Sequence, residues 1–453
     1  MQEDGEILQE NSGRALGILF LVTFIDMIGF GIVIPFLTYL VEDLAQAKGI
    51  SAIGLWVGII MTAYPLAQFI AAPIWGSLSD RIGRRPILMV GLVGNSVMFT
   101  VFGLAPTLLV ALIARFFAGF FNGNIPVAKA YIGDVSSPEK LASRMGLIGA
   151  AFGLGFTVGP FIGGELSSPA TRWEFFQGTI FETFPYLLPC LFASVLSIIS
   201  LVIAIFWLEE SLPVEKRNKS RTSSFVTRFA KVFSDSASMF KITPFGRLMF
   251  TLMFFFFGFT IMHAVFILYT QMPMSEGGIG FNEAQNGRVF GLIGIFGIIT
   301  QGFLIGPLNK RFGTKNLLVI SSIVTGIGLV LIPLGDTGNP WPYIIFICAL
   351  IAGGNGIFQP SANTIATEYA REQSLELGMV MGSVGAAGAF ARVLGPITGG
   401  VIWTITENSG LNYWYVIVFA VCGLLMLIAC LTSLGLPHSK SHSGLDTKVN
   451  SKT

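Results

Sequence analysis

The stretch that decides the fold is Gly76-Ser-Leu-Ser-Asp-Arg-Ile-Gly-Arg-Arg85, which follows a long apolar run. It recurs 230 residues later as Gly306-Pro-Leu-Asn-Lys-Arg-Phe-Gly-Thr-Lys315, again after an apolar run. A second landmark, Gly159-Pro-Phe-Ile-Gly-Gly164, recurs 236 residues later as Gly395-Pro-Ile-Thr-Gly-Gly400. Two landmarks repeated in the same order at nearly the same offset indicate a chain built from two related halves.

The composition indicates whether these halves fold in water or in a lipid bilayer. Of the 453 residues, 53% are hydrophobic and 11% are charged, whereas soluble domains carry about 25% charged residues. The net charge of +2 gives no basic excess for binding nucleic acid. Apolar runs of roughly 20 residues are long enough to cross a bilayer core of roughly 30 Å, and such spans must be helical to satisfy their backbone groups. The sequence therefore predicts an all-α integral membrane protein with twelve spans, at 15–40, 52–77, 86–105, 107–132, 145–166, 184–208, 247–270, 287–307, 316–335, 341–364, 378–404 and 412–436.

Lysine and arginine residues are distributed unequally between the two sides of these spans. With the N-terminus in the cytoplasm, the cytoplasmic segments hold 22 basic residues and the opposite segments hold three. Positive charge accumulates on the cytoplasmic side of membrane proteins, so both termini are expected there. We expect the plasma membrane as the location, with an organelle membrane as the alternative.

The expected organisation follows from the spans. It comprises a cytoplasmic tail (1–14), a six-helix bundle (15–208), a cytoplasmic central loop (209–246), a second six-helix bundle (247–436) and a second cytoplasmic tail (437–453). In the central loop, apolar residues recur at helical spacing among basic ones, which predicts an interfacial amphipathic helix. A solvated linker is the alternative. The apolar positions are Phe225, Phe229, Val232, Phe233 and Phe240.

The sequence lacks the motifs of common enzyme classes. It contains no G-x-x-x-x-G-K-[ST], H-E-x-x-H, C-x-x-C or G-x-G-x-x-G pattern, so nucleotide hydrolysis by that loop, metalloprotease chemistry and dinucleotide binding are not indicated. The four cysteines all lie inside apolar runs, which makes a zinc site or a disulfide framework improbable. We expect no enzymatic activity, no metal and no cofactor. The cysteines are Cys190, Cys348, Cys422 and Cys430.

Three ionisable residues, Asp26, Arg115 and Arg392, fall deep inside spans. At a rise of about 1.5 Å per residue, Asp26 lies about 16 Å and Arg115 roughly 18 Å from the inner face, so the two can face each other. Charges inside a bilayer are costly and usually face a water-filled cavity with a partner. Asp26 is the candidate proton carrier, because burial and a nearby arginine shift a carboxyl group's proton affinity in opposite directions. The alternative is an Asp26–Arg115 ion pair that only holds two helices together.

Other polar residues inside the spans are candidates for lining a cavity. His263 titrates near neutral pH in its free form and could relay protons, although a neutral packing role is the simpler interpretation. Polar groups in membrane helices also serve as interhelical hydrogen-bonding groups. The remaining candidates are Tyr64, Gln68, Asn122, Asn124, Gln301, Asn355 and Gln359.

Three patterns resemble the major facilitator superfamily, and within it the twelve-span drug:proton antiporters of the tetracycline-efflux type. The family's loop motif is matched at Gly76, Leu78, Asp80, Arg81, Gly83, Arg84 and Arg85; the fourth-span motif at Arg115, Gly119 and Gly123; and the fifth-span antiporter motif at Gly155, Gly159, Pro160, Gly163 and Gly164. The stretch ending at Asp134 also resembles that branch, whereas Lys310 stands in the second half where Asp80 stands in the first. The resemblance implies two pseudo-symmetric six-helix bundles, a monomer and energy from a proton gradient.

The glycines of the fifth-span motif have two interpretations. Small residues at i and i+4 let another helix approach closely, and a proline can bend a span. The pattern is therefore compatible with plain helix packing, whereas the complete motif favours a gating helix.

The leading functional hypothesis is export of a small amphipathic organic solute in exchange for protons, by alternating access of the two halves. The alternative is a proton-coupled importer or facilitator of organic ions. A receptor or scaffold without transport activity is the third hypothesis, and buried charges argue against it because they are costly. The three deep charges sum to +1, which favours an anionic or zwitterionic solute. The expected partners are this solute, protons and the lipid bilayer.

The resemblance further implies that Asp80 helps to hold the halves together when the cavity opens outward. The predicted docking point is the start of span 11 near Gly378, where free backbone N–H groups attract a carboxylate. Arg81, Arg84 and Asp134 are expected in the same charge cluster. In the alternative interpretation, Asp80 stabilises the loop or sets the topology.

Overall fold

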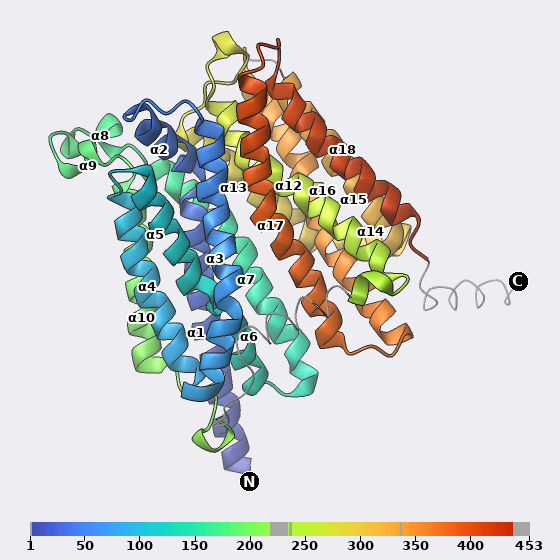
Figure 1. Cartoon of the computed structure of the whole chain (residues 1–453). Coiled ribbons are helices and arrows are strands. Elements are labelled where there is room, and N and C mark those ends of the chain that lie inside the picture. Colours follow the sequence, from blue (N-terminus) through green and yellow to red (C-terminus); the bar gives the residue numbers. More distant parts are fainter. Residues whose placement is uncertain (1, 218–233, 235–237, 336–337, 438–453) are drawn as a thin grey trace, which may run out of the picture. The chain divides into compact units, whose positions relative to one another are not determined.

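The computed structural model describes residues 2–217, 234, 238–335 and 338–437, and it is all-helical over these ranges (Figure 1). It contains twelve helical segments long and apolar enough to cross a membrane, which confirms the predicted number. Most of the expected interfacial helix of the central loop, including Phe225, Phe229, Val232 and Phe233, and most of the C-terminal tail lie outside the described residues. The spans are Leu16–Gln46, Ile53–Ile82, Arg84–Gly103, Leu108–Asp134, Ser143–Leu166, Leu187–Trp207, Phe245–Gln271, Glu283–Phe312, Thr314–Leu334, Pro340–Glu372, Leu377–Glu407 and Val416–Leu434.

The helices form two compact units. The first unit comprises Met1–Phe225 and Ile267–Gly294, and the second comprises Val226–Phe266 and Ile295–Thr453. The hairpin formed by the end of span 7 and the start of span 8 thus packs with the first unit, although the sequence assigns it to the second half. The expected division into 15–208 and 247–436 stays a prediction.

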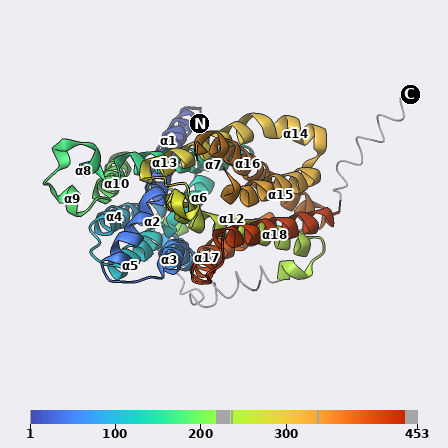
Figure 2. The ribbon, with the colours of Figure 1, turned by 90° about the horizontal axis from the view of Figure 1, so that it is seen from above.

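In the first unit, α1 packs on α7 and α10, α10 packs on α4, α4 packs on α5, and α5 packs on α3 (Figure 2). Short helices α8 and α9 connect α7 to α10. The elements of this unit are α1 (Gln2–Ile32), α2 (Ile34–Gln46), α3 (Ile53–Ile82), α4 (Arg84–Gly103), α5 (Leu108–Phe121), α6 (Ile125–Asp134), α7 (Pro138–Leu166), α8 (Pro169–Arg172), α9 (Ile180–Thr183) and α10 (Leu187–Trp207).

The second unit repeats this packing. Helix α15 packs on α16 and α18, as α4 packs on α5 and α10 in the first unit. Helices α12 and α13 each begin in one unit and end in the other. The elements are α12 (Phe245–Gln271), α13 (Glu283–Ile299), α14 (Ile305–Phe312), α15 (Thr314–Leu331), α16 (Pro340–Glu372), α17 (Leu377–Glu407) and α18 (Tyr415–Leu434).

Two spans of the first unit are interrupted. Span 1 breaks at Val33, between α1 and α2, where Pro35 cannot donate a backbone hydrogen bond. Span 4 passes through a tight 3₁₀ turn, Asn122–Asn124, between α5 and α6. Asn122 and Asn124 of this turn are both buried in the first unit.

Three glycines of the fifth-span motif, Gly155, Gly159 and Gly163, pack α7 against α1. A Cβ atom on Gly155 would stand 2.5 Å from Met27 Cβ, and one on Gly159 would stand 2.6 Å from the Ile28 carbonyl oxygen. A Cβ atom on Gly163 would overlap the backbone of Ile32. Only glycine permits this approach. Helix α7 continues through Pro160 without a break.

The matching motif in the second half packs α17 against α12 in the same way. A Cβ atom on Gly399 of α17 would stand 3.0 Å from the Ile261 carbonyl oxygen of α12. Gly395 faces Thr260, whose hydroxyl donates to the Ala391 carbonyl oxygen at 2.9 Å. The repeated sequence therefore builds the same interhelical contact twice, between spans 1 and 5 and between spans 7 and 11.

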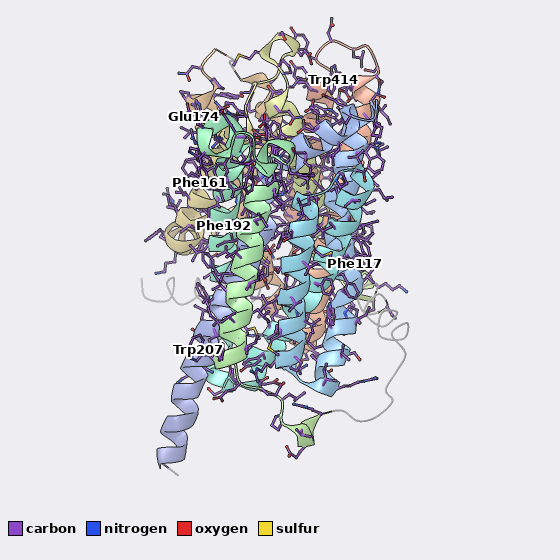
Figure 3. The ribbon with its side chains drawn as sticks, turned by 90° about the vertical axis from the view of Figure 1, so that its left-hand side faces the viewer. Phe117, Phe161, Glu174, Phe192, Trp207 and Trp414 are labelled. Atoms are coloured by element: carbon purple, nitrogen blue, oxygen red, sulfur yellow. The ribbon has the colours of Figure 1, made fainter. Side chains whose placement is uncertain are left out.

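Large apolar side chains cover the outside of the helices. Phe117 on α5 and Phe192 and Trp207 on α10 are exposed and point away from the bundle (Figure 3). Helices that are apolar on their outer face as well as their inner face are typical of membrane spans.

Candidate functional site

Asp26 lies inside the first unit and is 6% exposed. One turn later on the same helix face, a Cβ atom on Gly29 would stand 2.9 Å from the Phe99 ring, so the side chain of Phe99 on α4 reaches the backbone of α1 here. One turn earlier on α4, the side-chain Nδ2 of Asn95 donates to Asp26 Oδ1 at 3.5 Å. The sequence-predicted proton carrier therefore has a neutral amide as its hydrogen-bond partner.

Arg115 is 4% exposed and lies against aromatic rings. Its Cζ atom is 4.5 Å from the centroid of the Tyr64 ring and 5.5 Å from that of Phe30. One turn later, a Cβ atom on Gly119 would stand 2.8 Å from Tyr64 Cα, so α5 can approach α3 only through a glycine at this position. The arginine and glycine of the fourth-span motif thus serve one contact, which holds the guanidinium on the Tyr64 ring.

No ion pair joins Asp26 to Arg115 among the described residues. The ion-pair interpretation from the sequence therefore finds no support in this geometry. Arg115 instead lies over the ring of Tyr64, and Asp26 has the amide of Asn95 as its partner.

Several polar atoms near these charges are buried without a hydrogen-bond partner in the described part of the chain. They are Arg115 Nε and Nη1, Asn95 Oδ1 and Asn124 Nδ2, whereas the buried side chains of Tyr64 and Asn122 interact with each other. Buried polar atoms are nearly always paired, so an unpaired cluster needs an explanation. Unpaired donors and acceptors around two opposite charges, inside a membrane bundle, mark this cluster as the candidate site.

Of the other sequence candidates, Gln68 is next to this cluster along the chain and the remaining ones lie apart from it. Gln68 lies on α3, one turn after Tyr64. His263, Asn355, Gln359 and Arg392 lie in the second unit. There the ring of His263 is tilted against that of Phe259, with 4.6 Å between ring centroids, and Gln359 donates to Asn363 at 3.2 Å. Their role in a cavity stays a prediction.

The loop motif builds a charge cluster at the predicted cytoplasmic end of the first unit. Arg84 donates to Asp80 at 2.6 Å, to Asp134 at 3.2 Å and to the Ser79 hydroxyl at 2.6 Å. Arg84 is buried, whereas the side chain of Asp80 is 43% exposed. Arg84 is therefore the centre of the cluster, and Arg81 is exposed beside it.

Sequence reasoning missed Glu210, which completes this cluster. Its carboxylate accepts hydrogen bonds from the backbone N–H groups of Arg84 at 2.8 Å and Arg85 at 3.3 Å, so it caps the start of α4. Gly83, with φ of 111°, ends α3 in a conformation that favours glycine, and a side chain there would overlap Glu210. The available signal was a pair of acidic residues, Glu209 and Glu210, at the end of an apolar span.

At the opposite end of the first unit, polar contacts bind the α12–α13 hairpin to α2 and α7. Tyr39 donates to the Phe281 carbonyl oxygen at 2.6 Å and accepts from Asn286 at 2.8 Å. Arg288 donates to Glu165 at 2.6 Å. The residues of this network were not among the candidates that the sequence suggested. Their contacts hold the hairpin in the first unit.

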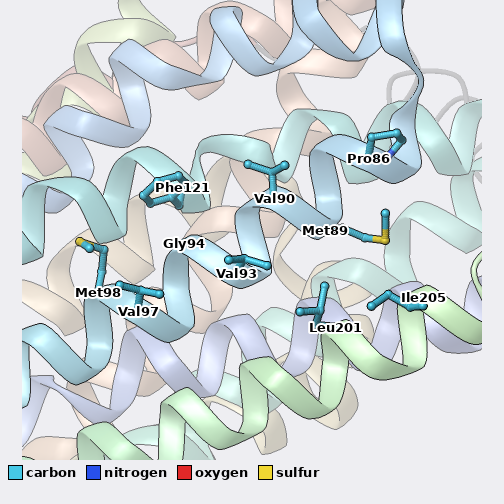
Figure 4. A pocket seen from close by; sticks show the side chains of 10 residues that line it. All are labelled: Pro86, Met89, Val90, Val93, Gly94, Val97, Met98, Phe121, Leu201 and Ile205. Atoms are coloured by element: carbon cyan, nitrogen blue, oxygen red, sulfur yellow. The ribbon is translucent and has the colours of Figure 1, made fainter.

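A groove of about 580 Å³ runs along the outside of α4 and α10 (Figure 4). Val93 and Val97 line it, and each is two residues from Asn95, which places them roughly 200° away around the helix axis. The groove therefore opens on the side of α4 opposite Asp26 and does not belong to the candidate site. Its lining residues are Pro86, Met89, Val90, Val93, Gly94, Val97, Met98, Phe121, Leu201 and Ile205.

Twelve membrane spans, a duplicated packing pattern and opposite charges buried in one bundle define a polytopic membrane protein that moves solutes. The sequence matches the family model of the Major Facilitator Superfamily over residues 19–374 and 278–451. The chain belongs to this superfamily, and it is accordingly a secondary transporter rather than an enzyme.

Relatives in sequence and structure agree with this assignment. The chain is 26% identical to the class C tetracycline resistance protein of Escherichia coli, over 93% of this chain and 97% of the relative. It is 27% identical to major facilitator superfamily domain-containing protein 10 of Mus musculus, over 94% and 93%. Among solved structures, it superposes on a D-xylose-proton symporter with a TM-score of 0.71 at 14% identity, over 94% of this chain and 98% of the other. The human organic anion transporter MFSD10 gives a TM-score of 0.65 at 22% identity, over 93% and 99%.

Proposed function

We propose that this transporter exports a small amphipathic organic solute in exchange for protons, and that Asp26 carries the proton. The observation that supports this most is the environment of Asp26, which is 6% exposed and has a neutral amide as its side-chain partner. A carboxylate that is buried without an ion-pair partner is costly, and binding a proton removes the charge. Proton binding and the solute then compete for one site, which couples their movements by linkage.

The buried charges of Asp26 and Arg115 favour a solute that carries both a positive and a negative group. Its cationic group would compete with the proton at Asp26, while its acidic group would be attracted by Arg115, whose Nε and Nη1 lack partners. A guanidinium suits a carboxylate because its planar donors match both oxygens. We therefore infer a zwitterionic solute with an apolar body, bound near the aromatic rings of Phe30 and Tyr64. Similarity to a tetracycline resistance protein supports export of an organic solute.

The second candidate function is proton-coupled uptake of organic anions. It is favoured by Arg115, a buried cation without a carboxylate partner among the described residues. An anionic solute would bind best when Asp26 is protonated, because the site then has a net positive charge. Proton and solute would then move in the same direction.

Purified protein in liposomes with an imposed pH gradient distinguishes the two candidates. Zwitterionic, anionic and cationic labelled solutes of matched size would be offered outside. If the proposal holds, an acidic interior drives zwitterion accumulation, whatever the orientation of the protein. Accumulation driven by an alkaline interior would indicate the second function instead.

The variant Asp26→Asn tests the proton carrier itself. It should abolish accumulation driven by the pH gradient and leave solute exchange measurable, because an amide cannot titrate. The matched control is Asn363→Asp on α16, which adds a carboxyl group elsewhere. Unchanged proton-driven transport in Asp26→Asn would contradict the proposal.

A further inference from the structure

Asn95 lies in the middle of α4 and is completely buried. Its Nδ2 atom donates to Asp26 Oδ1 at 3.5 Å, while its Oδ1 atom has no hydrogen-bond partner in the described part of the chain. The N–H group of the amide therefore has a hydrogen-bond partner, whereas its carbonyl oxygen has none among the described residues. An unsatisfied buried carbonyl oxygen is costly, so its position beside a group proposed to bind protons needs an explanation.

The hydrogen-bonding capacity of Asp26 and Asn95 explains why this carbonyl oxygen has no partner. An ionised carboxylate only accepts hydrogen bonds, so it can use the N–H group of Asn95 but not its carbonyl oxygen. A protonated carboxyl group gains an O–H donor and keeps a carbonyl acceptor. Acid and amide can then pair twice, with the acid O–H donating to Asn95 Oδ1 and Asn95 Nδ2 donating to the acid carbonyl.

We propose that Asn95 is the positioning residue for the proton on Asp26. Its N–H group pairs with the ionised carboxylate, and its carbonyl oxygen additionally accepts from the protonated acid. The inference rests on the proposed proton-carrying function of Asp26. Binding forms one O–H bond on the carboxyl group with a proton from water on one side. Release breaks that bond and returns the proton to water on the other side. The amide neither gains nor loses a proton in either step.

The surrounding helices provide few alternatives to Asn95. Tyr64 of α3 makes no hydrogen bond with Asp26 among the described residues. Arg115 of α5 lies over the Tyr64 ring and forms no ion pair with Asp26 in that part of the chain. Helix α7 contacts α1 through glycines. Among the described residues, Asn95 is thus the side chain that hydrogen-bonds Asp26.

A purely structural role for Asn95 makes a different prediction from a positioning role. Infrared difference spectra of the full chain in lipid, recorded between acidic and alkaline buffer, report the C=O stretch of protonated carboxyl groups. The band of Asp26 is identified by its loss in Asp26→Asn. In Asn95→Leu, which keeps the size but removes both hydrogen bonds, this band should move to higher frequency because the acid carbonyl loses its donor.

Ser194→Ala is the matched control. Ser194 of α10 is buried and its hydroxyl lies 2.8 Å from that of Ser96 on α4, so the variant also removes a polar α4 contact. It should leave the Asp26 band in place. Proton-driven transport should fall about tenfold in Asn95→Leu, the effect of one hydrogen bond of ordinary strength, and stay near the native rate in Ser194→Ala.

The outcomes separate the inference from the function on which it rests. If native protein shows no band that depends on Asp26, the proposed proton carrier is wrong. If the band exists and is unchanged in Asn95→Leu, the positioning role of Asn95 is wrong. Should Asn95→Leu fail to fold, the isosteric Asn95→Asp serves instead. Two adjacent carboxyl groups then share a proton, so an acid band should persist at more alkaline pH than in native protein, and an unchanged band would overturn the inference.

Discussion

The guanidinium of Arg115 lies over the ring of Tyr64, with 4.5 Å between Cζ and the ring centroid. A buried cation usually pairs with a carboxylate, but here the aromatic face takes that place while Nε and Nη1 keep their hydrogen-bonding capacity. The arrangement leaves Asp26 without an ion pair among the described residues, as its proposed role as proton carrier requires.

Arg115→Lys should lower proton-driven transport about tenfold or more, because an ammonium has neither the planar face nor the fixed donors of guanidinium. Accumulation and solute affinity in liposomes measure the effect. The control is Arg371→Lys, at an exposed position near the end of α16. Native coupling and affinity in Arg115→Lys would show that only the positive charge matters.

Asp80→Asn should slow turnover strongly while equilibrium solute affinity changes little. If Asp80 holds the outward-open state by docking near Gly378, losing about 1.4 kcal/mol shifts the equilibrium towards the inward-open state about tenfold. Cysteine-accessibility labelling from both sides of the membrane measures that shift. Asp134→Asn is the comparison, because Asp134 is the other carboxylate on Arg84. Equal effects of the two variants, with native accessibility, would indicate a role in the loop alone.

Glu210→Gln should lower thermal stability, since it removes the charge that caps the start of α4. Carboxylates at helix N-termini contribute about 0.3–2 kcal/mol, and the amide keeps a single, weaker acceptor oxygen for the N–H groups of Arg84 and Arg85. Thermal unfolding of detergent-solubilised protein measures the loss. Glu215→Gln, at an exposed position five residues later, is the control and should unfold at the native temperature. Equal stability of the two variants would mean that the cap contributes nothing.

Gly159→Ala and Gly153→Ala should have opposite effects although both lie on α7. A methyl group on Gly159 would stand 2.6 Å from the Ile28 carbonyl oxygen, whereas one on Gly153 would meet nothing within 4 Å. Alanine stabilises an unobstructed helix position by about 0.5–1 kcal/mol relative to glycine. Gly153→Ala should therefore unfold at or above the native temperature, and Gly159→Ala below it. Similar unfolding temperatures would argue against close packing of α7 on α1.

The sequence by itself determined the class of molecule. Its twelve apolar runs predicted twelve spans, and the repeated Gly-Pro-x-x-Gly-Gly motif predicted two related halves, whose equivalent contacts the structure contains. Helical rise also placed Asp26 and Arg115 at similar depth, because depth depends only on position along a helix.

Only the tertiary structure decided what those charges face. A membrane helix is apolar on all sides, so its sequence carries little information on which face turns inward. Asp26 and Arg115 face Asn95 and Tyr64, each from another span, whereas the start of α4 at Arg84 is capped by Glu210, which follows span 6. These contacts depend on glycines that leave room for a neighbour, which is the Phe99 ring at Gly29, the backbone of Tyr64 at Gly119 and the Glu210 side chain at Gly83. Depth is a property of one helix, whereas the rotation and spacing of neighbouring helices are set by packing between residues far apart in the chain.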